Sequence, residues 1–203
     1  RNRALEEATG RWVLFIDADE RLSGDLAQEI GAALQKSVSV EGEVAGQREV
    51  VGYWIPRNNL ILGRWVKHAG WWPDYQLRLF RRDRGRYDPQ RQVHEVLLLD
   101  GPTEKLSNPI IHYNYTSFRQ LLAKQRLYAS YEAQSQWVLG DRAKPHRFLS
   151  RPIREFFRRY IAWEGYLDGF LGLLLSLVMA WYALLVQIDL ARLSAQHKKV
   201  QTR

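Results

Sequence analysis

Trp12-Val13-Leu14-Phe15-Ile16-Asp17-Ala18-Asp19-Glu20 is the stretch of sequence on which the fold of this chain depends. Five consecutive apolar residues follow Gly10 and Arg11, and such a run is typical of a strand buried on both faces, so we predict a parallel strand here. The strand ends in an Asp-x-Asp turn. Ligands of open α/β sheets bind beyond the carboxyl ends of the strands, which makes this turn a candidate ligand site.

The two aspartates of the turn suit a hard metal ion. Asp17 and Asp19 are separated by one residue, and a bend at Ala18 lets both carboxylates address one cation together with its bound ligand. Oxygen ligands of this kind suit Mg²⁺ or Mn²⁺. Acidic clusters also arise by chance, so a merely solvated acidic loop is the alternative. The turn alone leaves both interpretations open.

The composition restricts the classes of protein to which the chain can belong. Its 203 residues suit one domain with an appendage. The net charge of +8 favours anionic partners, such as nucleotide phosphates, nucleic acid or acidic lipid. Cysteine is absent, which excludes disulfides and thiolate metal sites. Eight tryptophans and ten tyrosines indicate a membrane interface or stacking on carbohydrate.

Helical and extended patterns alternate around the central strand, so we predict an α/β fold. Residues 1–9 read as the end of a helix closed by Gly10. Ser23 is the expected N-cap of a second helix, whose buried face consists of Leu26, Ile30, Ala33 and Leu34. Further extended segments are expected at residues 50–56, 59–62, 76–80, 92–98 and 109–113.

A loop rich in aromatic and basic residues runs from Gly63 to Asp74. Glycines bound its central part, which suits a mobile substrate lid, and we assign Trp72 and Asp74 to substrate binding. The alternative is an ordinary surface loop whose tryptophans are tucked into the core.

The sequence becomes helical from Ser117 onward. Ser117 and Gln120 fit a capping box, and the expected face of the helix consists of Phe118, Leu121, Leu122, Tyr128 and Ala129. A basic linker is expected at residues 141–159, around Pro145 and Pro152. Its arginines are suited to hold the protein against an anionic membrane.

An uncharged run of 20 residues extends from Gly169 to Ile188. As a helix it would be about 30 Å long, close to the thickness of the hydrocarbon core of a bilayer. Basic residues lie on both sides of the run, so the excess of Lys and Arg that usually marks the cytoplasmic end of a membrane helix does not show which end of this one would face the cytoplasm. A helix that spans or is embedded in a membrane is one interpretation, and a core or dimer helix is the other.

Three parts of the sequence can meet at one edge of the predicted sheet: the aspartate turn, His94-Glu95 and His112. A metal ion held by Asp19 and His112 would stabilise a diphosphate leaving group. Glu95 could take the proton from an attacking hydroxyl, and Arg78 could contact phosphate. Each of these residues alone also has an ordinary explanation, either as a hydrogen-bonded histidine or as a solvated charge.

The chain resembles family-two glycosyltransferases, in particular the bacterial branch that contains lipopolysaccharide-core β-glucosyltransferases. The motifs that are similar are Arg1-Asn2-Arg3-Ala4-Leu5, Gly10 to Arg21, Gly63-x-Trp65, Gly70, Leu77-Arg78-Leu79-Phe80, Val93-His94-Glu95, His112-Tyr113-Asn114-Tyr115 and Asp168-Gly169-x-x-Gly172. They extend over nearly the whole chain.

The resemblance implies a GT-A fold with a Rossmann-like mixed sheet, and inverting transfer from a nucleotide-diphosphate sugar. It places Asp17 near the nucleotide or sugar and makes Asp19 and His112 ligands of Mg²⁺ or Mn²⁺. Glu95 matches the catalytic base with His94 beside it. Asn2 falls where family members approach the nucleotide. Family members begin with a strand and turn that clasp uracil and ribose, which we expect this chain to lack.

The resemblance also implies the organisation and setting of the protein. We expect a partial catalytic domain at residues 1–115, a helical extension with the basic linker at 116–163, and a hydrophobic helix with a basic tail at 164–203. The expected partners are a nucleotide-diphosphate sugar, a lipid-linked or lipopolysaccharide-core acceptor and a membrane surface, without specific nucleic acid. The expected location is the cytoplasmic face of the bacterial inner membrane, peripheral or with one C-terminal transmembrane helix.

Two other functions are compatible with parts of the sequence. Phosphohydrolases of the haloacid-dehalogenase type also place Asp-x-Asp after a strand, but Arg21 occupies the position where those enzymes have Thr or Val. A basic module without catalysis that binds nucleic acid or anionic lipid is the other alternative, carried by the arginines of residues 142–159.

Overall fold

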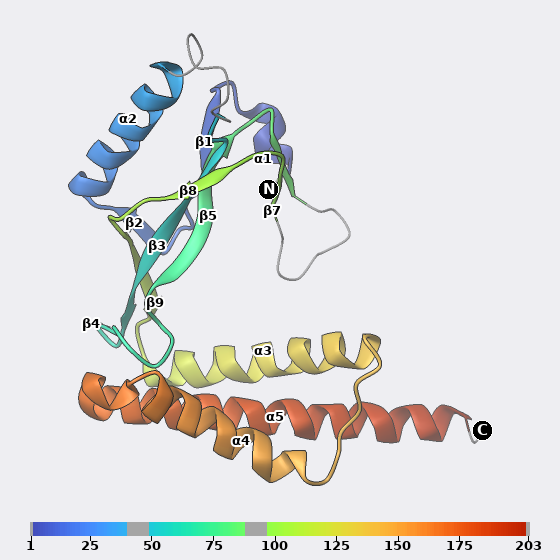
Figure 1. The fold of residues 1–203 in the computed structure, drawn as a ribbon. Coiled ribbons are helices and arrows are strands. Elements are labelled where there is room, and N and C mark those ends of the chain that lie inside the picture. Colours follow the sequence, from blue (N-terminus) through green and yellow to red (C-terminus); the bar gives the residue numbers. More distant parts are fainter. Residues whose placement is uncertain (1, 40–48, 88–96, 202–203) are drawn as a thin grey trace. The chain divides into compact units, whose positions relative to one another are not determined.

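The computed structural model describes residues 2–39, 49–87 and 97–201 (Figure 1). The chain forms two compact units, and each consists of two separate segments. The first, called here the sheet unit, comprises Arg1–Asn59 and Pro73–Asn114. The second, called the helical unit, comprises Leu60–Trp72 and Tyr115–Arg203.

The sheet unit is an α/β structure with a mixed sheet, as the sequence predicts. Its helices are α1 (Asn2–Glu7) and α2 (Gly24–Ser39). Its strands are β1 (Trp12–Leu14), β2 (Glu20–Leu22), β3 (Gly52–Ile61), β5 (Asp74–Arg81), β6 (Gly85–Tyr87), β7 (Leu97–Leu99), β8 (Thr103–Lys105) and β9 (Ile110–Tyr115), with the last residues of β3 and β9 in the helical unit. The main sheet has the order β1-β5-β3-β9-β2, and β8 pairs with β3 in parallel.

Strand β1 lies at the edge of the main sheet and differs from the predicted parallel strand in its direction and length. β1 is antiparallel to β5, with Val13 opposite Phe80, and its strand pairing ends at Leu14. Trp12 and Leu14 pack against one hydrophobic cluster, whereas Val13 and Phe15 pack against another. The residues of the run are therefore apolar because both faces of the sheet are packed against other side chains. A sequence pattern cannot distinguish this case from a strand in a parallel sheet.

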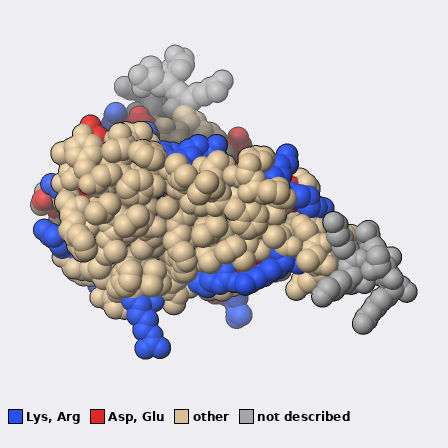
Figure 2. All heavy atoms as spheres, turned by 90° about the horizontal axis from the view of Figure 1, so that it is seen from below, with Lys and Arg blue, Asp and Glu red and all other residues tan. Residues whose placement is uncertain are grey.

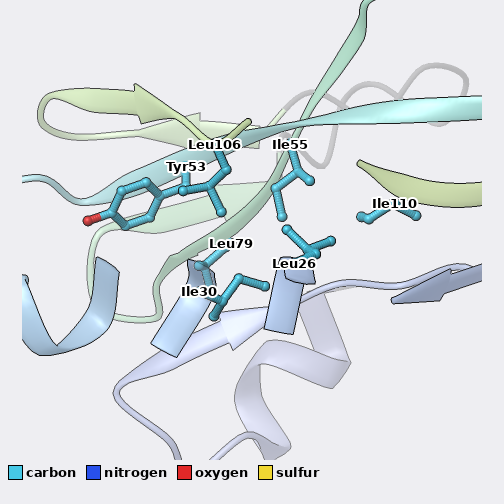
Figure 3. Packing of buried hydrophobic residues seen from close by; sticks show 7 residues of the cluster. All are labelled: Leu26, Ile30, Tyr53, Ile55, Leu79, Leu106 and Ile110. Carbon is cyan, nitrogen blue, oxygen red and sulfur yellow. The ribbon is translucent and has the colours of Figure 1, made fainter. Parts of the chain in front are cut away.

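The main core of the sheet unit lies between α2 and the sheet. It consists of Leu26, Ile30, Tyr53, Ile55, Leu79, Leu106 and Ile110 (Figure 3). The predicted cap of α2 is confirmed, because Ser23 Oγ accepts a hydrogen bond of 3.2 Å from the Leu26 amide. Ala33 and Leu34 are partly buried against the same cluster, as expected from the helical period.

The two extended segments expected at residues 50–62 form one strand. β3 runs without interruption from Gly52 to Ile61, and Pro56 lies within it, opposite Tyr75 of β5. The second hydrophobic cluster, on Leu5, Phe80 and Tyr87, includes α1 and β6. Residues 88–96, where a strand with His94 and Glu95 is expected, lie outside the described residues.

The helical unit contains the long helices predicted from the C-terminal sequence. Its elements are β4 (Arg64–Trp65), α3 (Phe118–Val138), α4 (Arg147–Phe157), the π-helical turn η1 (Arg158–Ala162), the 3₁₀ turn η2 (Gly165–Asp168) and α5 (Gly169–Gln201). The segment expected as a basic linker is thus mostly helix, and Pro152 lies inside α4.

The N-terminus of α3 is capped almost as predicted. Ser117 Oγ accepts a 3.2 Å hydrogen bond from the Gln120 amide. Gln120 Oε1 in return accepts from the Thr116 amide at 2.8 Å, one residue earlier than in a standard capping box. The buried face of α3 is Leu121, Gln125, Ala129 and Ala133, whereas the predicted face members Phe118 and Tyr128 are exposed.

The loop expected as a lid is anchored to the helices of its own unit. The Ala69 amide donates to Trp163 O at 2.8 Å, and Arg159 Nη1 donates to Ala69 O at 2.7 Å. The Asp168 carboxylate accepts from the His68 amide at 2.8 Å. These contacts, together with the packing of Trp71 against the core of the helical unit, favour the alternative of an ordinary surface loop with tryptophan tucked into the core.

Candidate functional site

The Asp-x-Asp turn is a tight turn closed by one backbone hydrogen bond and by the carboxylate of Glu20. The Glu20 amide donates to Asp17 O at 2.9 Å, and the Asp17 amide donates to Glu20 Oε2 at 3.0 Å. Glu20 then begins β2, opposite His112 of β9. The pairing places the turn beside the strand that carries the predicted histidine ligand.

Arg78 of β5 stabilises the turn through hydrogen bonds to two of its carboxylates. Its side chain is 5% exposed, and Nη2 donates to Asp17 Oδ2 at 2.5 Å and to Glu20 Oε1 at 2.7 Å. Burial lowers the pKa of Arg78, but the charges and hydrogen bonds of Glu20 and Asp17 outweigh it and raise the pKa above the ordinary value. Arg78 therefore orients the carboxylates, and its burial leaves little surface for the phosphate contact that the sequence suggests.

His112 is oriented by a chain of hydrogen bonds. Asn59 Nδ2 donates to Asp74 Oδ2 at 3.1 Å, so Asn59 Oδ1 is left as an acceptor. His112 Nδ1 lies 2.7 Å from that oxygen and must carry the proton of the neutral ring. The lone pair of the neutral imidazole is then on Nε2.

The other ring nitrogen of His112 faces the second aspartate of the turn. His112 Nε2 lies 3.5 Å from Asp19 Oδ2, and the Asp19 side chain is 44% exposed. Burial and the charge of Arg57 lower the pKa of His112, against the opposite effect of Asp19. A neutral Nε2 lone pair and a carboxylate oxygen that face each other repel, so a cation or a water that donates to both fits between them.

The Asp19–His112 pair fits a divalent ion that also binds substrate. Neighbouring ligands of a Mg²⁺ ion at about 2.1 Å lie about 3 Å apart, close to the observed separation. In the described part of the chain no group of three or more His, Cys, Asp or Glu residues is placed to hold a metal. Mg²⁺ sites commonly use one or two side chains and take their other ligands from water and substrate phosphates.

Asp74 completes the polar network behind the histidine. It accepts from Arg57 Nη2 at 2.6 Å, from Asn59 and from Gln76 Nε2 at 2.9 Å. Burial raises the pKa of Asp74, but the charge of Arg57 and these hydrogen bonds more than offset it, so the pKa lies below the ordinary value. Asp74 thus acts through Asn59 on the orientation of His112.

The structure brings together five of the residues assigned from sequence and separates others. The five are Asp17, Asp19, Asp74, Arg78 and His112. Asn2 instead exchanges two hydrogen bonds of 3.0 Å with the backbone of Tyr87, so its amide fastens α1 to β6. Trp72 belongs to the helical unit and packs edge-on against Trp65. His94 and Glu95 lie outside the described residues.

Sequence reasoning missed Glu20, Arg57 and Asn59. Glu20 follows the Asp-x-Asp pattern directly, yet only its burial distinguishes it from a solvated acid. Arg57-Asn58-Asn59 interrupts a long apolar strand, and three polar residues in such a position are the signal that was available. Polar side chains inside a buried strand need partners, which makes them candidates for a site.

Comparison with known proteins finds a glycosyltransferase that is similar to this chain. No family model matches the chain. The lipopolysaccharide core biosynthesis glycosyltransferase LpsC of Rhizobium meliloti (strain 1021) is 27% identical over 182 residues, which cover 88% of this chain. The chain spans 64% of the length of that relative. The resemblance predicted from the motifs is thereby confirmed: along most of its length, this chain is similar to a lipopolysaccharide-core glycosyltransferase.

Proposed function

We propose that the chain is part of an inverting glycosyltransferase that moves a sugar from a nucleotide-diphosphate donor to an envelope glycan or lipopolysaccharide-core acceptor. The Asp19–His112 pair, in which Asn59 orients His112, is the observation that carries the proposal, and Arg78 holds the neighbouring Asp17 and Glu20 of the same turn. The similarity of the chain to LpsC supports sugar transfer as the reaction and a lipopolysaccharide-core acceptor as the substrate. The mixed sheet and the turn at the end of β1 agree with a GT-A fold.

Asp19 and His112 would hold Mg²⁺ or Mn²⁺, which supplies Lewis-acid stabilisation of the diphosphate leaving group. The histidine presents Nε2 because Asn59 occupies Nδ1. Asp17 would approach the nucleotide or sugar, with its carboxylate fixed by Arg78. The hydrogen bonds of Asp17 with Arg78 and of His112 with Asn59 support these roles, because they orient two of the three side chains in advance.

Glu95 is proposed as the general base because it matches that position in the family. It would take the proton from the acceptor hydroxyl while the oxygen bonds to the anomeric carbon. The bond from that carbon to the diphosphate breaks in the same step, and the nucleoside diphosphate leaves. Attack opposite to the leaving group inverts the anomeric configuration.

The setting proposed for this reaction is the cytoplasmic face of the bacterial inner membrane. One helix among the described residues, Gly165–His197, is long and apolar enough to cross a membrane. Peripheral attachment and a single C-terminal span are both compatible with its length and composition. A lipid-linked acceptor would be reached from that face.

The test is donor turnover by the full-length protein. A panel of nucleotide sugars is assayed with Mn²⁺ and a lipopolysaccharide-core acceptor, and both nucleoside diphosphate release and sugar transfer are measured. Asp19→Ala and Glu95→Gln should each lower turnover about a hundredfold or more. Asp100→Ala and Glu104→Gln, which alter exposed acids of the same unit, are the matched controls.

Three results would contradict parts of the proposal. Near-native turnover by Glu95→Gln would show that Glu95 is not the base. Turnover that is unaffected by Asp19→Ala would remove the metal site. Diphosphate release without transfer to any acceptor would indicate a hydrolase.

A further inference from the structure

The helical unit has an apolar surface that its own core does not cover. Leu149, Ile153, Phe157 and Ile161 follow one another at four-residue spacing through α4 and η1, which places them in one stripe. Leu149 is 69% and Phe157 57% exposed. We call these four residues the α4 stripe. Monomeric proteins seldom expose a continuous apolar row without a partner for it.

Other exposed apolar side chains follow directly after the stripe. Trp163, Tyr166, Leu167, Phe170 and Leu177 are all exposed, and Phe170 is 77% exposed. Figure 2 shows a broad face of the molecule whose middle is uncharged, with Lys and Arg along its border. Aromatic residues beside an apolar surface are typical of the boundary between lipid and water.

A row of arginines accompanies the α4 stripe. Arg147, Arg151, Arg154 and Arg158 recur every three or four residues and occupy the side of α4 next to the apolar side chains. Residues 141–159 hold seven basic residues against two acidic ones. Arg147 and Arg151 pair with Asp141, and Arg158 pairs with Glu155. Arg154 is exposed and forms no ion pair with any residue in the described ranges, so it is the arginine most available to a lipid phosphate. An apolar face flanked by arginines is the pattern of a helix that lies in the interface of an anionic bilayer.

The long apolar helix α5 is already engaged inside its own unit. Leu175, Gln187 and Leu190 are fully buried, and α3 covers α5 through Ala129 and Ala133. The Asp189 carboxylate accepts two hydrogen bonds from Arg126 of α3, at 2.7 and 3.0 Å. If α5 crossed a bilayer in this packing, α3 would enter the hydrocarbon with its charges.

We propose that the helical unit is a monotopic membrane-binding module in which α4 and α5 lie in the plane of an anionic phospholipid bilayer. The α4 stripe and Phe170 enter the boundary of the acyl chains, and the arginines of α4 contact lipid phosphates. A twofold contact with a second copy would bring two arginine rows together, so charge disfavours that partner. The attachment does not depend on the proposed function, because no residue of the Asp19–His112 site takes part.

The test is binding of the chain to vesicles without any substrate. Vesicles of phosphatidylcholine are compared with vesicles that contain phosphatidylglycerol as well. The chain should bind the anionic vesicles and lose most of this binding in high salt. Leu149→Asp should weaken binding about tenfold or more, and Arg154→Ala about fivefold on anionic vesicles alone. Leu98→Asp, at a 51% exposed leucine of the sheet unit, is the matched control and should bind as the wild type does.

The absence of cysteine allows the depth of the helices to be measured directly. Single cysteines that replace Ile153 or Leu177 are labelled with a fluorophore, and lipids brominated at shallow or deep acyl positions quench it. Shallow lipids should quench both labels best. Strongest quenching of the Leu177 label by deep lipids would show a spanning helix and overturn the proposal. Equal vesicle binding by Leu149→Asp, or a dimer that this substitution dissociates without any vesicle binding, would also overturn it.

Discussion

Arg78 is a buried cation whose charge is balanced by Glu20 and Asp17. The Arg78 and Glu20 side chains are 5% and 0% exposed, so neither charge can turn to water if its partner is removed. Removal of one member of a buried pair costs about 3–5 kcal/mol because the other remains uncompensated. The same contacts fix the Asp-x-Asp turn, so stability and site geometry depend on one side chain.

Arg78→Ala is expected to lower the free energy of unfolding by about 3 kcal/mol in urea denaturation, the lower end of that range, because Arg57 Nη1 still lies 3.7 Å from Glu20 Oε1. Arg82→Ala, at an exposed position four residues later, should change it by less than about 0.5 kcal/mol. Equal effects of the two substitutions would show that the Arg78–Glu20 pair does not hold the turn.

Asp74 should contribute to the acid sensitivity of the fold. The pKa of Asp74 is lowered in the folded protein, so the folded state takes up this proton at a lower pH than the unfolded state does. Its stabilisation is complete above the unfolded pKa of about 3.9 and is lost as the pH falls through the lower pKa of the folded state.

The measurement is the free energy of unfolding between about pH 2 and pH 5. Its decrease with falling pH should be shallower in Asp74→Asn than in the wild type. Asp100→Asn, at a side chain that is 92% exposed, should keep the wild-type slope. A wild-type slope in Asp74→Asn as well would contradict the assigned pKa shift.

At the residue scale the sequence predicted which groups could act, and the structure supplied their orientation. Asp17, Asp19 and His112 were proposed from their residue types and from the strands that precede or contain them, and their roles stay predictions. The role of Asn59 was not, because it depends on a contact between residues 53 positions apart in the chain. A sequence pattern contains no information on which nitrogen of His112 a distant amide occupies.

Helix α3 shows at the element scale how far local rules reach. Its start was predicted from Ser117 and Gln120, and the cap forms with those two side chains.

Ser117→Ala should lower the free energy of unfolding of the helical unit by about 0.5–2 kcal/mol. Ser135→Ala, at an exposed position inside the same helix, should have no destabilising effect, since Ala is the better helix former. Thermal melts that show no difference between the variants would contradict the cap.

Elements were predicted incorrectly where tertiary packing outweighs a local signal. Pro145 and Pro152 indicated a linker, yet α4 forms and lies against α5 (Figure 1). A proline removes one helical hydrogen bond, and packing along the rest of the helix offsets that loss. β1 was wrongly predicted to be parallel. Its apolar run shows that both faces of the strand are covered, which happens in parallel sheets but also in this antiparallel one.

The whole molecule consists of two units, and each unit is built from two segments that alternate along the chain with those of the other. Residues 60–72 leave the sheet unit after β3 and belong to the helical unit. The bond between the His68 amide and Asp168 joins residues 100 positions apart. Such long-range contacts leave no pattern in the local sequence. The sequence therefore predicted an N-terminal α/β half and a C-terminal helical half, but it could not show that residues 60–72 belong to the helical unit.

The central claim for the whole protein is that Asp19 and His112 bind a divalent ion together with a diphosphate. Binding of Mn²⁺ to the full-length protein, measured by electron paramagnetic resonance with a nucleoside diphosphate present, tests it most directly. Asp19→Asn should weaken Mn²⁺ binding about a hundredfold, and Asn59→Ala about tenfold or more because His112 loses its orientation. Asp100→Asn should bind Mn²⁺ as the wild type does. Equal Mn²⁺ affinity in all four proteins would contradict the account.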